Sequence, residues 1–151
     1  DAAAAFASRQ IDAWAIFDPY YTIALQQGGR ILRDGRGINT ALGFITASEP
    51  SLADPAKRAA IVQFLDRLGR AGDWALANPE AYAQAYGQLT RLPIESARLI
   101  TARASVAARP VSEADIVALQ AVADRSARDG ILPVRVDVRA ISDTQLWKRP
   151  A

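Results

Sequence analysis

The sequence changes character near residue 48, and this change constrains the fold more than any single motif. Before it, an apolar run at residues 11–17 and strand candidates at residues 30–33 and 42–47 alternate with a helical pattern over residues 19–27. The short apolar run at residues 11–17, closed by Asp18-Pro19, is typical of a buried strand. Alternation of such runs with helices favours a parallel or mixed α/β sheet over an all-helical bundle.

After residue 48 the pattern is helical. Asp54 is expected to cap a helix that has Pro55 in its first position and runs to about residue 77. Asn78-Pro79 breaks this helix, and two more are predicted over residues 80–89 and 93–102. The apolar stripe predicted for the long helix consists of Ile61, Phe64, Leu65, Leu68 and Ala71.

The last helix carries the strongest start signal in the sequence. Ser112 and Asp115 have the capping-box spacing, and Val111 with Ile116 can form a hydrophobic staple. Gly130 is expected to end the helix, and residues 131–139 return to an extended pattern. The side chains expected to face inward are those of Ile116, Leu119, Val122 and Ala123.

Composition excludes several classes of site within this chain. The 151 residues include no histidine and no cysteine, which removes Ser-His-Asp and Cys-His catalysis and metal sites built from those ligands. Gly35 and Gly37 lack the third glycine of a dinucleotide-binding loop. The formal charge is only +2, and the arginines are scattered among acids, which indicates a solvated surface and no nucleic-acid partner. We therefore expect no catalytic residue, metal or cofactor here.

The end of the apolar run at residues 11–17 is the candidate site. On a strand, Asp12 and Asp18 would lie about 20 Å apart, too far for an acid–base pair. Asp18 alone would sit at the carboxyl end of a buried strand, where open α/β sheets bind ligands, or would cap the following turn. Its aromatic neighbours would wall an apolar pocket or fill the core; they are Trp14, Phe17, Tyr20 and Tyr21.

Residues 7–20, ASRQIDAWAIFDPY, resemble a segment of the aliphatic-sulfonate-binding proteins of ABC importers, within the nitrate/sulfonate/taurine-binding family. In that family a valine and a second tryptophan stand where this chain has Ile11 and Phe17. The resemblance continues through GRILRDG at residues 29–35, the end of the long helix, and the segment from Leu119 to Arg139. It covers nearly the whole chain.

The resemblance implies an α/β, helix-rich C-terminal half of a type II periplasmic-binding-protein fold. Residues 1–36 would form the terminal part of lobe 2, and residues 37–151 the returning part of lobe 1. Asp1 would then be a cut, with the N-terminal half of the protein absent. The implied function is non-enzymatic capture of an aliphatic sulfonate between two lobes and its delivery to a membrane permease. The implied location is the periplasm, or a lipid anchor outside the cytoplasmic membrane.

By resemblance, the ligand-binding residues are Trp14, Phe17, Asp18 and Tyr20. Asp18 would meet an amine on a zwitterionic ligand such as taurine, or order a hydrogen bond near the hinge. The aromatic residues would flank the alkyl portion, and Phe17 in place of tryptophan removes an indole N–H donor. Open alternatives are nitrate, taurine or a thiamine-precursor pyrimidine as ligand, or a desulfinase-like enzyme whose nucleophile lies in the missing half.

Overall fold

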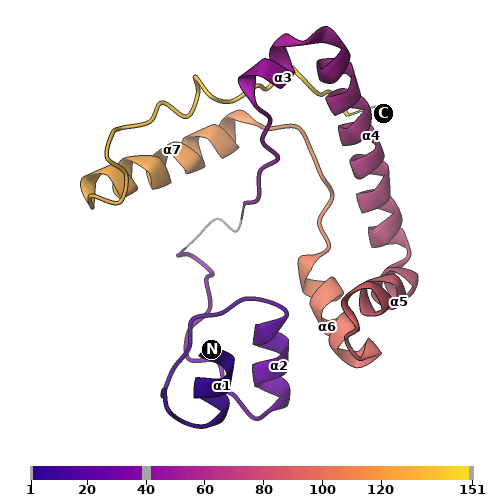
Figure 1. Cartoon of the computed structure of the whole chain (residues 1–151), viewed down its shortest axis with the longest axis vertical. Helices are drawn as coiled ribbons and strands as arrows, with labels where there is room; N and C mark the ends of the chain where they lie inside the picture. Colours follow the sequence, from indigo (N-terminus) through magenta and orange to yellow (C-terminus); the bar gives the residue numbers. More distant parts are fainter. Residues whose placement is uncertain (1, 39–41, 150–151) are drawn as a thin grey trace. The chain divides into compact units, whose positions relative to one another are not determined.

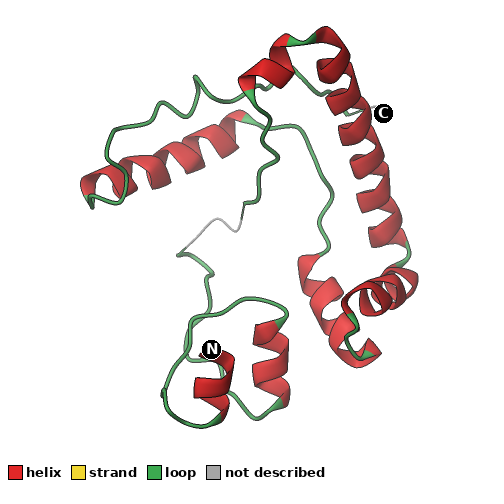
Figure 2. Cartoon of the chain, in the orientation of Figure 1, coloured by secondary structure: helices red, strands yellow, loops and turns green. Residues whose placement is uncertain are grey.

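The computed structural model describes residues 2–38 and 42–149, and every regular element in these residues is an α-helix (Figure 2). Figure 1 labels the helices in chain order. They are α1 (Ala2–Ala7), α2 (Tyr20–Gln26), α3 (Glu49–Ala53), α4 (Pro55–Ala77), α5 (Pro79–Thr90), α6 (Ile94–Ala104) and α7 (Glu113–Arg128).

The described residues form two compact units. The first contains residues 2–34 and 72–107, and the second contains residues 35–38, 42–71 and 108–149. One of the boundaries between the two units, at residues 71 and 72, lies within α4. The predicted division into lobes at residues 36 and 37 concerns a larger two-lobed protein and stays a prediction.

The predicted helix starts are confirmed where the sequence signal is local. The carboxylate of Asp54 accepts hydrogen bonds from the backbone N–H groups of Ala56 and Lys57, at 2.9 and 3.2 Å, at the beginning of α4. At α7 the Ser112 hydroxyl accepts from Asp115 N–H, and the Asp115 carboxylate accepts from Ser112 N–H. Both arrangements satisfy N–H groups that have no partner within the helix.

The predicted strands at residues 11–17, 30–33, 42–47 and 131–139 do not form in the described residues, where these segments run as irregular or turn-containing chain. A strand is defined by hydrogen bonds to a neighbouring strand, and the described residues offer these segments no such neighbour. These segments have sequences typical of strands, but a sequence pattern does not determine whether a neighbouring strand is present to pair with.

The first unit is built around close contact between α5 and α6. Ala83, Ala97 and Ile100 are fully or almost fully buried between these helices. A methyl group added at Gly87 would lie 3.4 Å from the Cβ atom of Ala97, so the small residue permits this approach. Arg91 ends α5 in the left-handed conformation, with φ at 59°. The helix α2 packs on α6, with Ser96 donating a 3.0 Å hydrogen bond to Gln26.

The second unit has its core on the inner face of α7, where Ile116, Ala123 and Val138 are buried and Val111 and Leu119 pack against them. The staple residue Val111 thus packs where the sequence predicts. Gln120 takes the place of a strand neighbour for residues 136–138: its amide donates to Val136 O and accepts from Val138 N–H, both at 2.9 Å.

Trp147 completes the second unit against α4. Its indole N–H donates a 2.7 Å hydrogen bond to Asp66, and its ring lies over Gly69, where an added Cβ atom would come within 3.2 Å of the ring. The predicted stripe of α4 is correct at Leu65 but wrong at Phe64 and Ala71, which are exposed. On α7, Val122 is likewise exposed. Helical period places a residue on a face, but only a packed neighbour buries it.

No helix in the part of the chain that the structure describes combines the length and apolar character needed to cross a membrane.

Candidate functional site

The predicted site lies in the first unit, at the junction between residues 11–18 and α2. Trp14 is half-buried between two other rings, with centroids 6.0 Å from Phe6 and 5.8 Å from Tyr20, both tilted. Tilted aromatic pairs at these separations are favourable beyond the area they bury. The structure therefore brings Trp14 and Tyr20 together and adds Phe6, which the sequence did not single out.

Phe17 stands apart from this aromatic cluster. Its side chain is 81% exposed, and it forms no ring pair with any aromatic side chain among the described residues. Tyr20 is also exposed, at 52%. Two large apolar side chains thus lie open to solvent beside Asp18, as expected for a surface that another molecule or segment covers.

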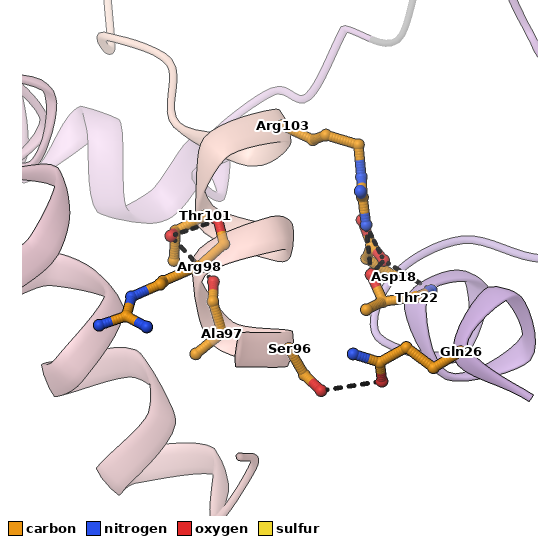
Figure 3. A network of polar contacts seen from close by, with 8 residues as sticks. All are labelled: Asp18, Thr22, Gln26, Ser96, Ala97, Arg98, Thr101 and Arg103. Carbon is orange, nitrogen blue, oxygen red and sulfur yellow. Dashed lines mark hydrogen bonds and ion pairs between the residues drawn. The ribbon is translucent and has the colours of Figure 1, made fainter. Parts of the chain in front are cut away.

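Asp18 is the centre of a polar cluster that we call the Asp18 cluster, formed by Asp18, Thr22 and Arg103 (Figure 3). Arg103 Nε donates to Asp18 Oδ2 and Arg103 Nη2 to Asp18 Oδ1, each at 3.0 Å. The Thr22 hydroxyl donates to Asp18 Oδ1 at 2.6 Å, and the Thr22 backbone N–H donates to the same oxygen at 3.1 Å. The bidentate pair and the threonine hold the carboxylate from two sides.

The cluster closes through a bond between its other two members. Arg103 Nη2 also donates to the Thr22 hydroxyl, so that hydroxyl accepts from arginine while it donates to aspartate. Thr22 is almost completely buried, whereas the Arg103 side chain is partly exposed. The Arg103 Cζ atom lies 4.9 Å from the centre of the Tyr21 ring, a cation–π contact that fixes the side chain further.

The electrostatic balance at Asp18 favours the charged form. Burial by itself raises the pKa of this carboxyl, but the hydrogen bonds from Arg103 and Thr22 and the positive charge of Arg103 outweigh burial and lower the pKa. Asp18 is therefore ionised and compensated by a fixed cation. The prediction that Asp18 caps the turn before α2 has its counterpart in the bond from Thr22 N–H.

The sequence could not have found Arg103, since 85 residues separate it from Asp18. Thr22 carried a local signal: it follows Asp18 by four residues, the spacing at which one side chain reaches the next turn. Asp12, on the same segment, is exposed.

Two open depressions lie elsewhere, and neither contains a predicted site residue. One is lined in the first unit by residues of α4, α5 and α6, including Glu80, Arg98 and Thr101. There Arg98 donates hydrogen bonds to Glu80 and Glu95. The other is lined in the second unit by Asp124, Ala127, Arg128 and Arg135. In the described ranges, no three acidic side chains converge as metal ligands would.

Comparison with known proteins identifies relatives over nearly the whole chain. An aliphatic sulfonates-binding protein of Escherichia coli (strain K12) is 34% identical over 143 residues, which is 92% of this chain and 44% of the relative. A protein of the same description from Bacillus subtilis (strain 168) is 24% identical, over 99% of this chain and 45% of the relative. No family model matches the chain.

A solved structure agrees with these relatives. The crystal structure of the periplasmic aliphatic sulphonate binding protein SsuA from Escherichia coli matches with a TM-score of 0.79 and 29% identity, covering 93% of this chain and 46% of that protein. The chain thus spans a little under half the length of the relatives that it matches. These matches confirm the resemblance and the fold class predicted from the sequence, and the partial coverage is consistent with a helix-rich C-terminal half.

Proposed function

We propose that this chain is one half of a periplasmic solute-binding protein of an ABC importer, which captures aliphatic sulfonates between two lobes and delivers them to a membrane permease. The observation that carries the proposal is the match of 93% of the chain, at a TM-score of 0.79, to a periplasmic aliphatic sulphonate binding protein. Closure of two lobes around a ligand is a hinge motion, and the permease would recognise the closed form.

The exposed aromatic side chains support a ligand at the end of residues 11–18. Phe17 and Tyr20 present apolar surface to solvent beside the Asp18 cluster, and the Trp14 ring contacts that of Tyr20. Such surface suits the alkyl portion of a sulfonate, whereas the sulfonate group itself needs N–H and O–H donors. We assign those donors to the complementary half, so that neither half binds the ligand alone.

Exposed apolar residues in the extended segments support the complementary half as a partner. Leu32, Phe44 and Ile45 are between 40% and 64% exposed, in segments whose sequence predicts strands. Extended segments can join the strands of another polypeptide through backbone hydrogen bonds. The relatives are more than twice as long as this chain, and the part of them that it does not match supplies the occupant.

The role proposed is binding without chemistry. The matched relatives are described as binding proteins, and the described residues hold Asp18 in an ion pair instead of beside a second carboxylate. Nitrate, a pyrimidine or a desulfinase-like reaction has no support in these contacts, so the aliphatic sulfonate remains the proposed ligand.

The test joins the chain to the N-terminal half of the Escherichia coli relative and measures the melting temperature with and without alkanesulfonates, taurine, nitrate and a pyrimidine. A ligand present at 100 times its Kd adds about 2.7 kcal/mol to the stability, which raises the melting temperature by several degrees. A rise with alkanesulfonates is expected. A joined protein that melts cooperatively, but whose melting temperature no alkanesulfonate raises, would contradict the proposal.

A further inference from the structure

Asp18 is the only acidic side chain among the four predicted ligand-binding residues, and the structure shows which groups already donate hydrogen bonds to its carboxylate. An ionised carboxylate offers about four acceptor positions. Four donors reach the Asp18 oxygens: Thr22 N–H, the Thr22 hydroxyl and two N–H groups of Arg103. Three of them meet at Oδ1, and Arg103 Nε holds Oδ2. Little acceptor capacity is left for a ligand.

The charge of Asp18 is also compensated. Arg103 pairs with both carboxylate oxygens in the planar, bidentate geometry that makes such pairs specific. A ligand ammonium group that reached Oδ2 would lie next to the guanidinium, whose Nε is 3.0 Å from the same oxygen. Repulsion between these two cations opposes an amine at this position.

Arg103 is itself held in place from three directions. It is bonded to Asp18, it donates to the nearly buried Thr22 hydroxyl, and it lies over the Tyr21 ring. A side chain restrained in this way does not move aside without losing several contacts at once. Figure 3 shows Arg103 extending from the end of α6 to Asp18, while Arg98 of the same helix points away from this cluster.

We infer that Arg103 is a positioning residue that withholds the Asp18 carboxylate from ligand amines, and so makes the proposed site selective for sulfonates that carry no amine. This inference rests on the proposed function. It assigns the role of Asp18 to ordering α2 and α6, in place of direct contact with an ammonium group. The selectivity is thus decided by a residue that need not touch the ligand.

The binding test compares two ligands of similar size, ethanesulfonate and taurine, which differ by the amine. In the joined protein, Arg103→Gln leaves Asp18 on Thr22 but removes its compensating charge. The ratio of the taurine Kd to the ethanesulfonate Kd should then fall by about tenfold, which is the change in affinity expected from one partly exposed charge-assisted hydrogen bond. Arg103→Lys, which keeps the charge without the bidentate geometry, should give a smaller fall.

Two control variants separate this effect from a general disturbance. Arg98→Gln removes another arginine of α6, which binds Glu80 and Glu95 and not Asp18, and should leave the ratio unchanged. Adding Asp18→Asn to Arg103→Gln should restore the original ratio, because the freed acceptor charge is gone. The inference would be overturned if Arg103→Gln left the ratio of the two Kd values unchanged. It would also be overturned if the unsubstituted protein bound taurine more tightly than ethanesulfonate and Asp18→Asn alone abolished that preference.

A second measurement uses the chain as it is and needs no ligand. Urea unfolding of Asp18→Asn, Arg103→Gln and the double variant forms a double-mutant cycle. For a positioning pair, the change in the urea midpoint of the double variant differs from the sum of the two single changes. Additive midpoints would overturn the positioning role. If the unsubstituted joined protein binds neither sulfonate, the proposed function fails, while this cycle still decides whether Arg103 holds Asp18.

Discussion

Two aspartates in this chain are bound in the same chemical way but at very different distances along the sequence. Asp115 accepts from Arg109 Nη1 and Nη2 at 2.5 and 2.7 Å and from the Ser112 hydroxyl at 2.7 Å. Asp18 accepts from Arg103 and from the Thr22 hydroxyl. We call the first set the Asp115 cluster. Each cluster contains one carboxylate, one bidentate arginine and one hydroxyl.

The difference lies in what each cluster joins. All members of the Asp115 cluster lie within seven residues, so the cluster fixes the beginning of α7 and the segment just before it. The Asp18 cluster joins the start of α2 to the end of α6 across 85 residues. A local cluster specifies where a helix begins, whereas a distant one specifies which segments pack together. The second kind is the one on which the proposed site depends.

The largest effect is expected from Asp18→Ala. It removes the acceptor of the nearly buried Thr22 hydroxyl and the ion-pair partner of Arg103, which should lower the free energy of unfolding by about 2–3 kcal/mol. Urea unfolding followed by tryptophan fluorescence measures the loss. The matched control is Asp12→Ala, an exposed aspartate on the same segment, which should change stability by less than about 0.5 kcal/mol. Equal effects of the two substitutions would show that the Asp18 cluster does not join the segments.

Ser112→Ala should have a smaller effect, confined to the beginning of α7. It removes a helix cap and one hydroxyl donor to Asp115, at a cost of about 1 kcal/mol. Far-ultraviolet circular dichroism during urea unfolding measures this change. Ser112→Thr keeps the cap and should retain most of the stability. A loss as large as that of Asp18→Ala would contradict the distinction between local and distant clusters.

Acidification should weaken both clusters, in a defined order. The pKa of each carboxyl is lowered in the folded state, at Asp115 chiefly by hydrogen bonds from Arg109 and Ser112, and at Asp18 by Arg103 and Thr22 against the opposing effect of burial. Each therefore contributes stability that is fully present above the ordinary aspartate pKa, about 3.9, and is lost as the pH falls through the lowered value. Burial is the largest single influence on the Asp18 pKa and opposes its lowering, whereas at Asp115 the hydrogen bonds come first, so we expect Asp18 to protonate before Asp115. Carboxyl carbon NMR titration tests this order, and protonation of Asp115 before Asp18 would refute it.

The smallest effect is expected at the exposed pair between Arg58 and Asp143, whose N–O distance is 3.5 Å. This contact also crosses 85 residues, but both side chains are open to solvent. Arg58→Ala should therefore change the free energy of unfolding by less than about 0.5 kcal/mol. The urea midpoint measures it, with the same substitution repeated at high salt. A loss comparable with that at Asp18 would show that distance along the chain, and not burial, sets the value of such a contact.

Prediction from sequence succeeded where the signal and its partner lie within a few residues. The Ser112–Asp115 capping box, the cap at Asp54 and the end of α7 near Gly130 all follow from local hydrogen bonding and backbone conformation. Prediction failed at Phe64 and Val122, whose helical positions were right but whose burial depends on a packed neighbour. It failed also for the strands, since a strand needs a partner segment.

For the candidate site, too, the sequence predicted some features and missed others. The sequence singled out Trp14, Phe17, Asp18 and Tyr20, and the structure brings Trp14 and Tyr20 together while Phe17 stays apart; their contact with a ligand stays a prediction. Neither Phe6 nor Arg103 carried a signal.

The sequence by itself determined the helix starts, the resemblance to sulfonate-binding proteins, and the exclusion of histidine and cysteine chemistry within the chain. These follow from residue identity and from interactions over a few positions. Only the tertiary structure decided that Asp18 is bound by Arg103 and that Gln120 replaces a strand neighbour for residues 136–138. Such contacts form when segments that are distant along the chain pack together, and no local pattern encodes which segments those are.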